Sequence, residues 1–496
     1  MDRLSRTNCM DCDAQMARTD CAARSGHTAR PGHTARDAQT AHADCVARLG
    51  HTARDAQTVR EGHAAREGAF FNLKRLLSAL FSRDKQDAAT KSILFVSPTG
   101  DFSNGAEISV FQLMKYLAGC GHRVFNVYPA YSPQAEDAYR AACNATGITP
   151  ICVPELRWWP DAPGGDINTP PDAPADLAAI GKICEIIRAN AVDVVISNTV
   201  NVYHGALAAA ECEVRHIWLI HEFPCGEFSY YRNKISFISE YSDALFCVEG
   251  TLRESLGPEL CGREIGTFLP YTNPGELGEF AANLPGHIVC IGLISERKNQ
   301  LELLRAYAML PEELKERQLV FIGGDGDDAN YRSVCDDFIA REVLTGISFL
   351  GNRENPWGYV SGRDIVVLPS KSETFGCVYA EALMCGVPVI ASDNPGFTTV
   401  NRLFGGGRLY PCGNVDALAR TIEETLRNFD AEHALAGANA PQVRAAFAVE
   451  NAYAQVIAEV ASDESARCKD YGDLAWLNEA NHGDLAWLNE LIVKPS

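Results

Sequence analysis

The segment from residue 364 to 396, DIVVLPSKSETFGCVYAEALMCGVPVIASDNPG, constrains the fold more than any other part of the chain. It begins with a β-branched apolar run, 364–368, which is typical of a buried parallel strand. After a polar loop, apolar residues at helical spacing predict a helix from Phe375 to Cys385, ended by Gly386. A second strand is predicted at Val387–Ala391. This order predicts a parallel α/β sheet, which binds ligands at the carboxyl ends of its strands.

Two glutamates give this segment its chemistry. Glu373 precedes the predicted helix, and Glu381 lies eight positions later, about two helical turns, so both can face the same side. Phe375, Gly376 and Cys377 open the helix, where free amides and the helix dipole favour an anion. One carboxylate could bind sugar hydroxyls and the other a ribose diol, with phosphate between them. The alternative is that both glutamates are ordinary surface charges.

The stretch SETFGCVYAEALMCGVPVIAS resembles the donor-binding signature of the retaining glycosyltransferases of family 4, which have the GT-B fold. The signature is a glutamate, seven residues and a second glutamate, with Phe-Gly after the first. The resemblance covers roughly residues 93–460. It implies an α/β protein with two Rossmann-like domains facing a cleft. We place an acceptor domain at 91–275 and a nucleotide-sugar donor domain at 276–462.

The resemblance also implies site residues elsewhere in the chain. Gly105 resembles the glycine loop of the first domain, although Asn104 stands where the family often has a second glycine. His221, after an apolar run, resembles a histidine that lies against the transferred sugar. Without the resemblance, one glycine before a helix is a turn, and a lone histidine after a strand is more often structural.

In the second domain, Lys298 resembles the family lysine that binds the donor diphosphate, where a cation neutralises charge on the leaving group. The family commonly has an arginine directly after the preceding glycine, but here Leu293 occupies that position. Arg297 is a candidate replacement, although adjacent residues need not face the same way. The alternative is that Arg297 and Lys298 are an exposed surface pair.

Both ends of the chain lie outside the resemblance. Residues 1–90 contain the repeat GHTARDAQT at 32–40 and 50–58, and we expect this core-poor region to be disordered. Its Cys9-x-x-Cys12 is a weak zinc signal without a second pair. An amphipathic helix predicted at Ala69–Arg83 can lie on a membrane or pack on its own domain. The tail, 463–496, repeats GDLAWLNE and has no assigned role.

Composition narrows the class of protein. The net charge of −20 argues against nonspecific nucleic-acid binding, which needs a basic surface. No apolar run reaches membrane-spanning length, and no signal-peptide pattern is present. The 18 cysteines are scattered, which favours reduced thiols. We therefore expect a cytoplasmic protein, with peripheral association at the inner face of a membrane as an option.

The resulting hypothesis is a hexosyltransferase that uses a UDP-, GDP- or ADP-sugar and retains the anomeric configuration. The resemblance implies no cofactor and no required metal, and an acceptor that is a glycan, a lipid-linked sugar or a small molecule. Glu373, His221 and Lys298 are the expected catalytic residues, with electrostatic and positioning roles. A noncatalytic sugar-nucleotide binder, a phosphorylase and an epimerase remain alternatives.

Overall fold

The computed structural model describes residues 90–465, apart from 103, 131–132, 160–172, 261, 276–285 and 327–328. The chain divides into two units, 1–87 and 88–496, and all described residues belong to the second. The repeats, the Cys9-x-x-Cys12 pair, the predicted helix Ala69–Arg83 and nearly all of the tail lie outside the described residues.

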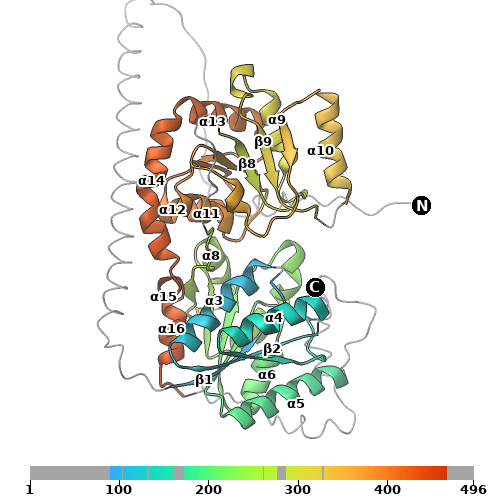
Figure 1. Cartoon of the computed structure of the whole chain (residues 1–496). Helices are drawn as coiled ribbons and strands as arrows, with labels where there is room; N and C mark the ends of the chain where they lie inside the picture. The colour runs from blue at the N-terminus through green and yellow to red at the C-terminus, as the bar shows by residue number, and fades with distance from the viewer. Residues whose placement is uncertain are drawn as a thin grey trace, which may run out of the picture. The chain divides into compact units, whose positions relative to one another are not determined.

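The described residues form two entirely parallel sheets, each flanked by helices (Figure 1). The first sheet has the order β3-β2-β1-β4-β5-β6-β7 and the second the order β10-β9-β8-β11-β12-β13. The strands are β1 (Ser92–Val96), β2 (Arg123–Tyr128), β3 (Ile148–Cys152), β4 (Val194–Asn198), β5 (Arg215–Ile220), β6 (Ala244–Val248), β7 (Gly266–Phe268), β8 (Ile288–Ile291), β9 (Leu319–Ile322), β10 (Ile347–Phe349), β11 (Ile365–Leu368), β12 (Val389–Ser392) and β13 (Arg408–Tyr410).

Helices connect the strands in both domains, labelled as in Figure 1. The helices are α3 (Gly105–Gly119), α4 (Pro133–Ala145), α5 (Ala173–Asn190), α6 (His204–Glu211), α7 (Ile235–Glu240), α8 (Thr251–Leu256), α9 (Gln300–Ala308), α10 (Ala329–Arg341), α11 (Cys377–Cys385), α12 (Pro395–Phe404), α13 (Val415–Arg427), α14 (Phe429–Ala446), α15 (Val449–Ala452) and α16 (Ala454–Ala461), with 3₁₀ turns at η1 (Gly226–Lys234), η2 (Glu312–Leu314) and η3 (Pro356–Tyr359).

The central strands are apolar because both of their faces are covered. In β8, Ile288 and Cys290 pack into the core on one face of the second sheet, and Val289 and Ile291 pack into the core on the other. Such continuous apolar strands are typical of parallel sheets covered by helices on both sides. The α/β class predicted from the sequence is therefore confirmed, with a doubly wound sheet in each domain.

Strand order reverses once in each sheet, and sheets of this kind bind ligands at such a reversal. In the first sheet, β1 to β3 follow one another toward one edge, and β4 to β7 follow one another toward the opposite edge. In the second sheet, β8 to β10 and β11 to β13 are arranged in the same way. Loops at the carboxyl ends of two such strands diverge and leave a crevice for ligands. The predicted donor residues follow β8 and β11, and Gly105 follows β1.

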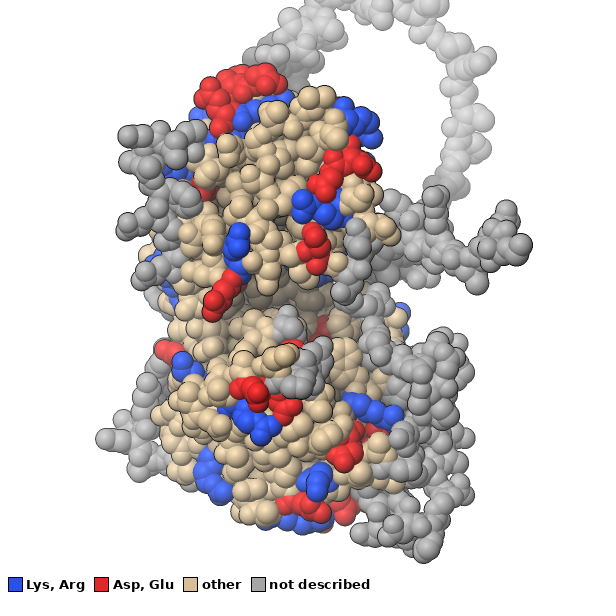
Figure 2. All heavy atoms as spheres, turned by 45° about the vertical axis from the view of Figure 1, so that its right-hand side comes forward, with Lys and Arg blue, Asp and Glu red and all other residues tan. Residues whose placement is uncertain are grey.

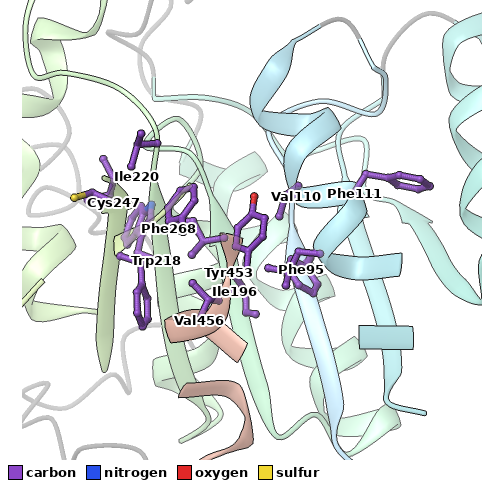
Figure 3. Close-up of a cluster of buried hydrophobic side chains, with 14 of the residues drawn as sticks. Phe95, Val110, Phe111, Ile196, Trp218, Ile220, Cys247, Phe268, Tyr453 and Val456 are labelled. Carbon is purple, nitrogen blue, oxygen red and sulfur yellow. The ribbon is translucent and has the colours of Figure 1, made fainter. Parts of the chain in front are cut away.

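The end of the described chain returns to the first sheet. The pattern of residues 443–461 is that of one helix, but the structure has α14, α15 and α16. Ala448 takes an extended conformation with ψ 136° between the first two, and Tyr453, with φ −110°, separates the last two. Tyr453 and Val456 lie among Phe95, Ile196 and Phe268 (Figure 3). The Tyr453 ring stacks on Phe268 at 5.2 Å between ring centroids, so the last helices complete the core of the first sheet.

The two domains also touch near α8 and α12. The hydroxyls of Thr251 and Thr399 lie 3.1 Å apart, and Arg402 pairs with Glu254 at 2.8 Å. On the face drawn in Figure 2 the surface is hollowed between the domains.

Candidate functional site

Two basic side chains and one carboxylate meet at the carboxyl ends of β8 and β11. Lys298 Nζ lies 2.7 Å from Glu373 Oε1, and Arg297 Nη1 lies 3.1 Å from Glu373 Oε2. Arg297 also donates to the Ser372 carbonyl at 3.1 Å. Although Arg297 and Lys298 are adjacent in sequence, both side chains converge on one residue of the opposite loop. Together they form a compact site with a net positive charge.

Two effects compete on the ionisation of Glu373. Burial raises the pKa of this carboxyl, but the nearby charges of Lys298 and Arg297 outweigh burial and hold the pKa below its ordinary value. The carboxylate is therefore ionised at neutral pH. Only 12% of its side chain is exposed.

The first turn of α11 presents free backbone amides next to these cations. Gly376 precedes the helix with φ 90°, and no side chain caps this end. A Cβ at Gly376 would lie 2.4 Å from Cδ1 of Phe397, so only glycine fits. Burial raises the pKa of the Cys377 thiol to about 12, and Phe375 packs against Phe447, so the two side chains are structural. The amides at this helix start suit an anion.

The second predicted glutamate has partners that the sequence did not indicate. Glu381 Oε2 accepts from the indole Nε1 of Trp357 at 2.7 Å. Its other oxygen, Oε1, accepts from the hydroxyl of Thr272. The carboxylate of Glu381 is thus oriented by two side chains from distant parts of the chain.

The entry to α3 shows why Asn104 is suited to its position. Asn104 is the N-cap of α3, and its side-chain oxygen accepts from the amide of Glu107 at 2.9 Å. A second glycine there would lack this bond. Gly105 begins the helix, and a Cβ built on it would meet nothing within 4 Å, so steric space does not require glycine at this point.

His221 lies directly after β5, at the carboxyl edge of the first sheet, as predicted from the sequence. Its ring is 8% exposed and packs edge-on against Phe268 at 5.0 Å between ring centroids. Burial lowers the pKa of His221 to about 3, so the imidazole is neutral. Among the described residues, its Nε2 has no hydrogen-bond partner. The structure therefore leaves a neutral, buried ring nitrogen without a partner among the described residues.

Glu107 is a buried carboxyl near this edge that sequence reasoning missed. Its side chain is fully buried in α3, and its Oε1 accepts from Asn198 Nδ2 at 2.9 Å. Burial raises the pKa of Glu107 to about 8, with a smaller contribution from Asp101. One signal in the sequence was available. Glu107 is the third residue of a helix whose other inward-facing side chains are mostly apolar.

A cavity of about 480 Å³ is lined in part by the loops that follow β8 and β11. Glu296, Asn299, Asn330 and Lys371 are among its lining residues, which do not include the predicted site residues.

Within the described part of the chain, no group of three or more His, Cys, Asp or Glu is placed to hold a metal ion. Across those same residues, no helix combines the length and apolarity that a membrane crossing needs.

Two family profiles match the two domains. "Glycosyltransferase Family 4" matches residues 103–259, and "Glycosyl transferases group 1" matches residues 282–442. The second profile contains Arg297, Lys298, Glu373 and Glu381. Both domains therefore have the sequence pattern of glycosyltransferase enzymes.

Curated relatives match over part of their length. The O-antigen chain mannosyltransferase B of Escherichia coli is 32% identical over 181 residues, which is 35% of this chain and 45% of that protein. The phosphatidyl-myo-inositol mannosyltransferase of Mycobacterium leprae is 33% identical over 151 residues, 30% of this chain and 39% of that protein. The chain thus aligns with less than half of the length of these relatives.

Solved structures match over their whole length. HepE of Anabaena, solved in complex with UDP and glucose, has a TM-score of 0.59 and 18% identity, covering 75% of this chain and 99% of that one. Sucrose-phosphate synthase of Thermosynechococcus elongatus has a TM-score of 0.56 and 19% identity, with coverage of 75% and 99%. These likenesses confirm the predicted fold of two Rossmann-like domains.

Proposed function

We propose that this chain, whose two domains match glycosyltransferase profiles, moves a sugar from a nucleotide-sugar donor to an acceptor. The observation that carries the proposal is the convergence of Lys298 and Arg297 on Glu373 beside the free amides of α11. Two cations and a helix start at a strand-order reversal suit a diphosphate, and the adjacent carboxylates suit sugar and ribose hydroxyls.

In the proposed reaction, a hydroxyl oxygen of the acceptor bonds to the anomeric carbon as the bond from that carbon to the diphosphate breaks. Negative charge grows on the leaving phosphate, which takes the proton that the acceptor hydroxyl loses. Lys298, Arg297 and the amides of Gly376 and Cys377 stabilise that charge in place. Glu373 faces the sugar, where its negative charge stabilises the positive charge that develops at the anomeric centre. His221 contributes a neutral nitrogen to hold the sugar from the first domain.

Two finer points of the proposal rest on resemblance. Retention of the anomeric configuration follows from the likeness to family 4. A glycan or lipid-linked acceptor is supported by the names of the relatives, an O-antigen chain and a phosphatidyl-myo-inositol mannosyltransferase. The segment Ala69–Arg83, outside the described residues, is our candidate for peripheral attachment near such an acceptor, to be tested by liposome flotation of Phe70→Glu/Leu77→Glu.

A panel of UDP-, GDP- and ADP-sugars tests the function. Calorimetry measures the binding of each donor, and released nucleoside diphosphate measures slow hydrolysis. We expect one nucleotide to bind best and its sugar to be hydrolysed. Binding without any turnover on added acceptors would favour a noncatalytic binder. A strict need for inorganic phosphate, or isomerisation of the sugar nucleotide, would favour a phosphorylase or an epimerase.

A further inference from the structure

The two oxygens of Glu381 are held by side chains of different kinds. Trp357, 24 positions earlier in the chain, donates its indole N–H to Oε2 at 2.7 Å. Thr272, 109 positions earlier, donates its hydroxyl to Oε1. The first partner lies within the second domain, in η3. The second lies in the segment that follows β7 and leads into the second domain.

Trp357 makes the more permanent of the two contacts. Its side chain is 1% exposed, and an indole has a single N–H to donate. Leaving that N–H buried without a partner would be unfavourable, so the bond to Oε2 persists. The turn that carries Trp357 is itself fixed, since the side chain of Asn355 caps it by accepting from the Gly358 amide at 3.3 Å. The plane of the Glu381 carboxylate is therefore set by a rigid neighbour.

Thr272 makes a contact that can be exchanged. It is partly exposed, and a threonine hydroxyl released from Glu381 can bond to water instead. A ribose hydroxyl approaching Oε1 has the same chemistry as the threonine hydroxyl, an O–H that donates to a carboxylate. Binding of a ribonucleotide at Glu381 would then compete with the contact to Thr272.

We propose that Trp357 is a positioning residue that orients Glu381 for the ribose diol, and that a ribose hydroxyl replaces Thr272 at Oε1. The inference rests on the proposed function, because it assumes that Glu381 faces the ribose of the donor. It adds that ribose binding frees the hydroxyl of Thr272, in the segment joining the two domains, from Glu381. Recognition of the nucleotide is thereby linked to the interdomain segment through one hydrogen bond.

The test compares nucleoside diphosphates by calorimetry on the full chain. The probes are whichever of UDP, GDP or ADP binds the parent protein best, and its 2′-deoxy and 3′-deoxy analogues. Trp357→Phe keeps the ring and removes the N–H, and we expect it to reduce the preference for the ribonucleotide by about tenfold. Trp159→Phe is the matched control, because it removes a buried indole bond, to the Val200 carbonyl at 2.7 Å, elsewhere in the chain.

Thr272→Val tests the exchange separately, since it keeps the shape and removes the hydroxyl. We expect the ribonucleotide to bind roughly threefold more tightly, with no change for the analogue that lacks the exchanging hydroxyl. An unchanged ribose preference in Trp357→Phe would overturn its positioning role. Equal or weaker ribonucleotide binding in Thr272→Val would overturn the exchange. Failure of the parent to bind any nucleoside diphosphate would overturn the proposed function itself.

Discussion

Lys298 illustrates what the sequence could and could not reveal about a single residue. Its place after an apolar strand and its resemblance to a family lysine suggested a contact with phosphate. That Arg297 turns to the same carboxylate could not be predicted, because adjacent residues in a loop can face opposite ways. The bonds of Glu381 to Trp357 and Thr272 were also hidden, since they join positions far apart in sequence.

Lys298 is expected to stabilise the leaving diphosphate. Lys298→Ala should raise the barrier to donor cleavage by about 2–4 kcal/mol, as for the loss of a preorganised donor. Arg297→Ala should also slow turnover, because the guanidinium meets the same carboxylate. Steady-state rates of nucleotide release measure both effects. The control is Lys371→Ala, because the ammonium of Lys371 pairs with Glu296 and not with Glu373. A parental rate in Arg297→Ala would leave Lys298 as the working cation of this loop.

Glu107 predicts a pH dependence of stability. Burial raises its pKa from 4.5 to about 8, so between these values the folded protein holds a proton that the unfolded chain has lost. This contribution is complete below pH 4.5 and is lost as the pH rises to 8, with a slope of about 1.4 kcal/mol per pH unit. Asn198 Oδ1 and Glu107 Oε2 both lack partners among the described residues.

Glu107→Gln imitates the protonated acid, because its amide can bond to Asn198 in the same way. Urea unfolding at pH 5, 6.5 and 8 should show a flatter pH profile than the parent, and a higher stability at pH 8. Glu240→Gln, at an exposed position, should leave the parental slope unchanged. Parallel profiles for parent and Glu107→Gln would show that this carboxyl ionises normally.

At the scale of elements, the strands were predicted better than the helix ends. β11 and β12 are apolar runs whose two faces are both buried, so pattern alone located them. The helix predicted from Phe375 instead begins at Cys377, because Gly376 adopts a left-handed conformation before it. The break between α14 and α15 falls at Ala448, a residue type that favours helix, so the sequence did not indicate it.

The start of α11 depends on Gly376. Gly376→Ala would place a methyl group 2.4 Å from the Phe397 ring and force alanine into φ 90°. We expect a loss of about 1–3 kcal/mol in stability, together with weaker donor binding as the amides move. Thermal unfolding and calorimetry measure the two effects. Gly181→Ala in α5, where the methyl meets nothing within 4 Å, should instead be neutral or stabilising.

At the scale of the whole molecule, the two ends of the chain are expected to differ in importance. Residues 1–68 are repetitive and poor in large apolar residues, so their deletion should leave donor hydrolysis unchanged. Deletion of 448–496 should abolish it, because this removes Tyr453 and Val456 from the core of the first sheet. Rates of the purified truncated proteins test the contrast. A large fall after removal of 1–68 alone would contradict it.

The proposed donor site lies at the carboxyl ends of β8 and β11. The most direct measurement is nucleotide release from the best-binding donor, with calorimetry of the intact donor, for the parent, Glu373→Gln and Glu381→Gln. Glu373→Gln should lower turnover by on the order of tenfold or more, with little change in donor binding. Glu381→Gln should mainly weaken binding, by roughly 1–3 kcal/mol. Parental turnover in Glu373→Gln with poor donor binding, and the opposite in Glu381→Gln, would contradict this placement of the sugar nucleotide.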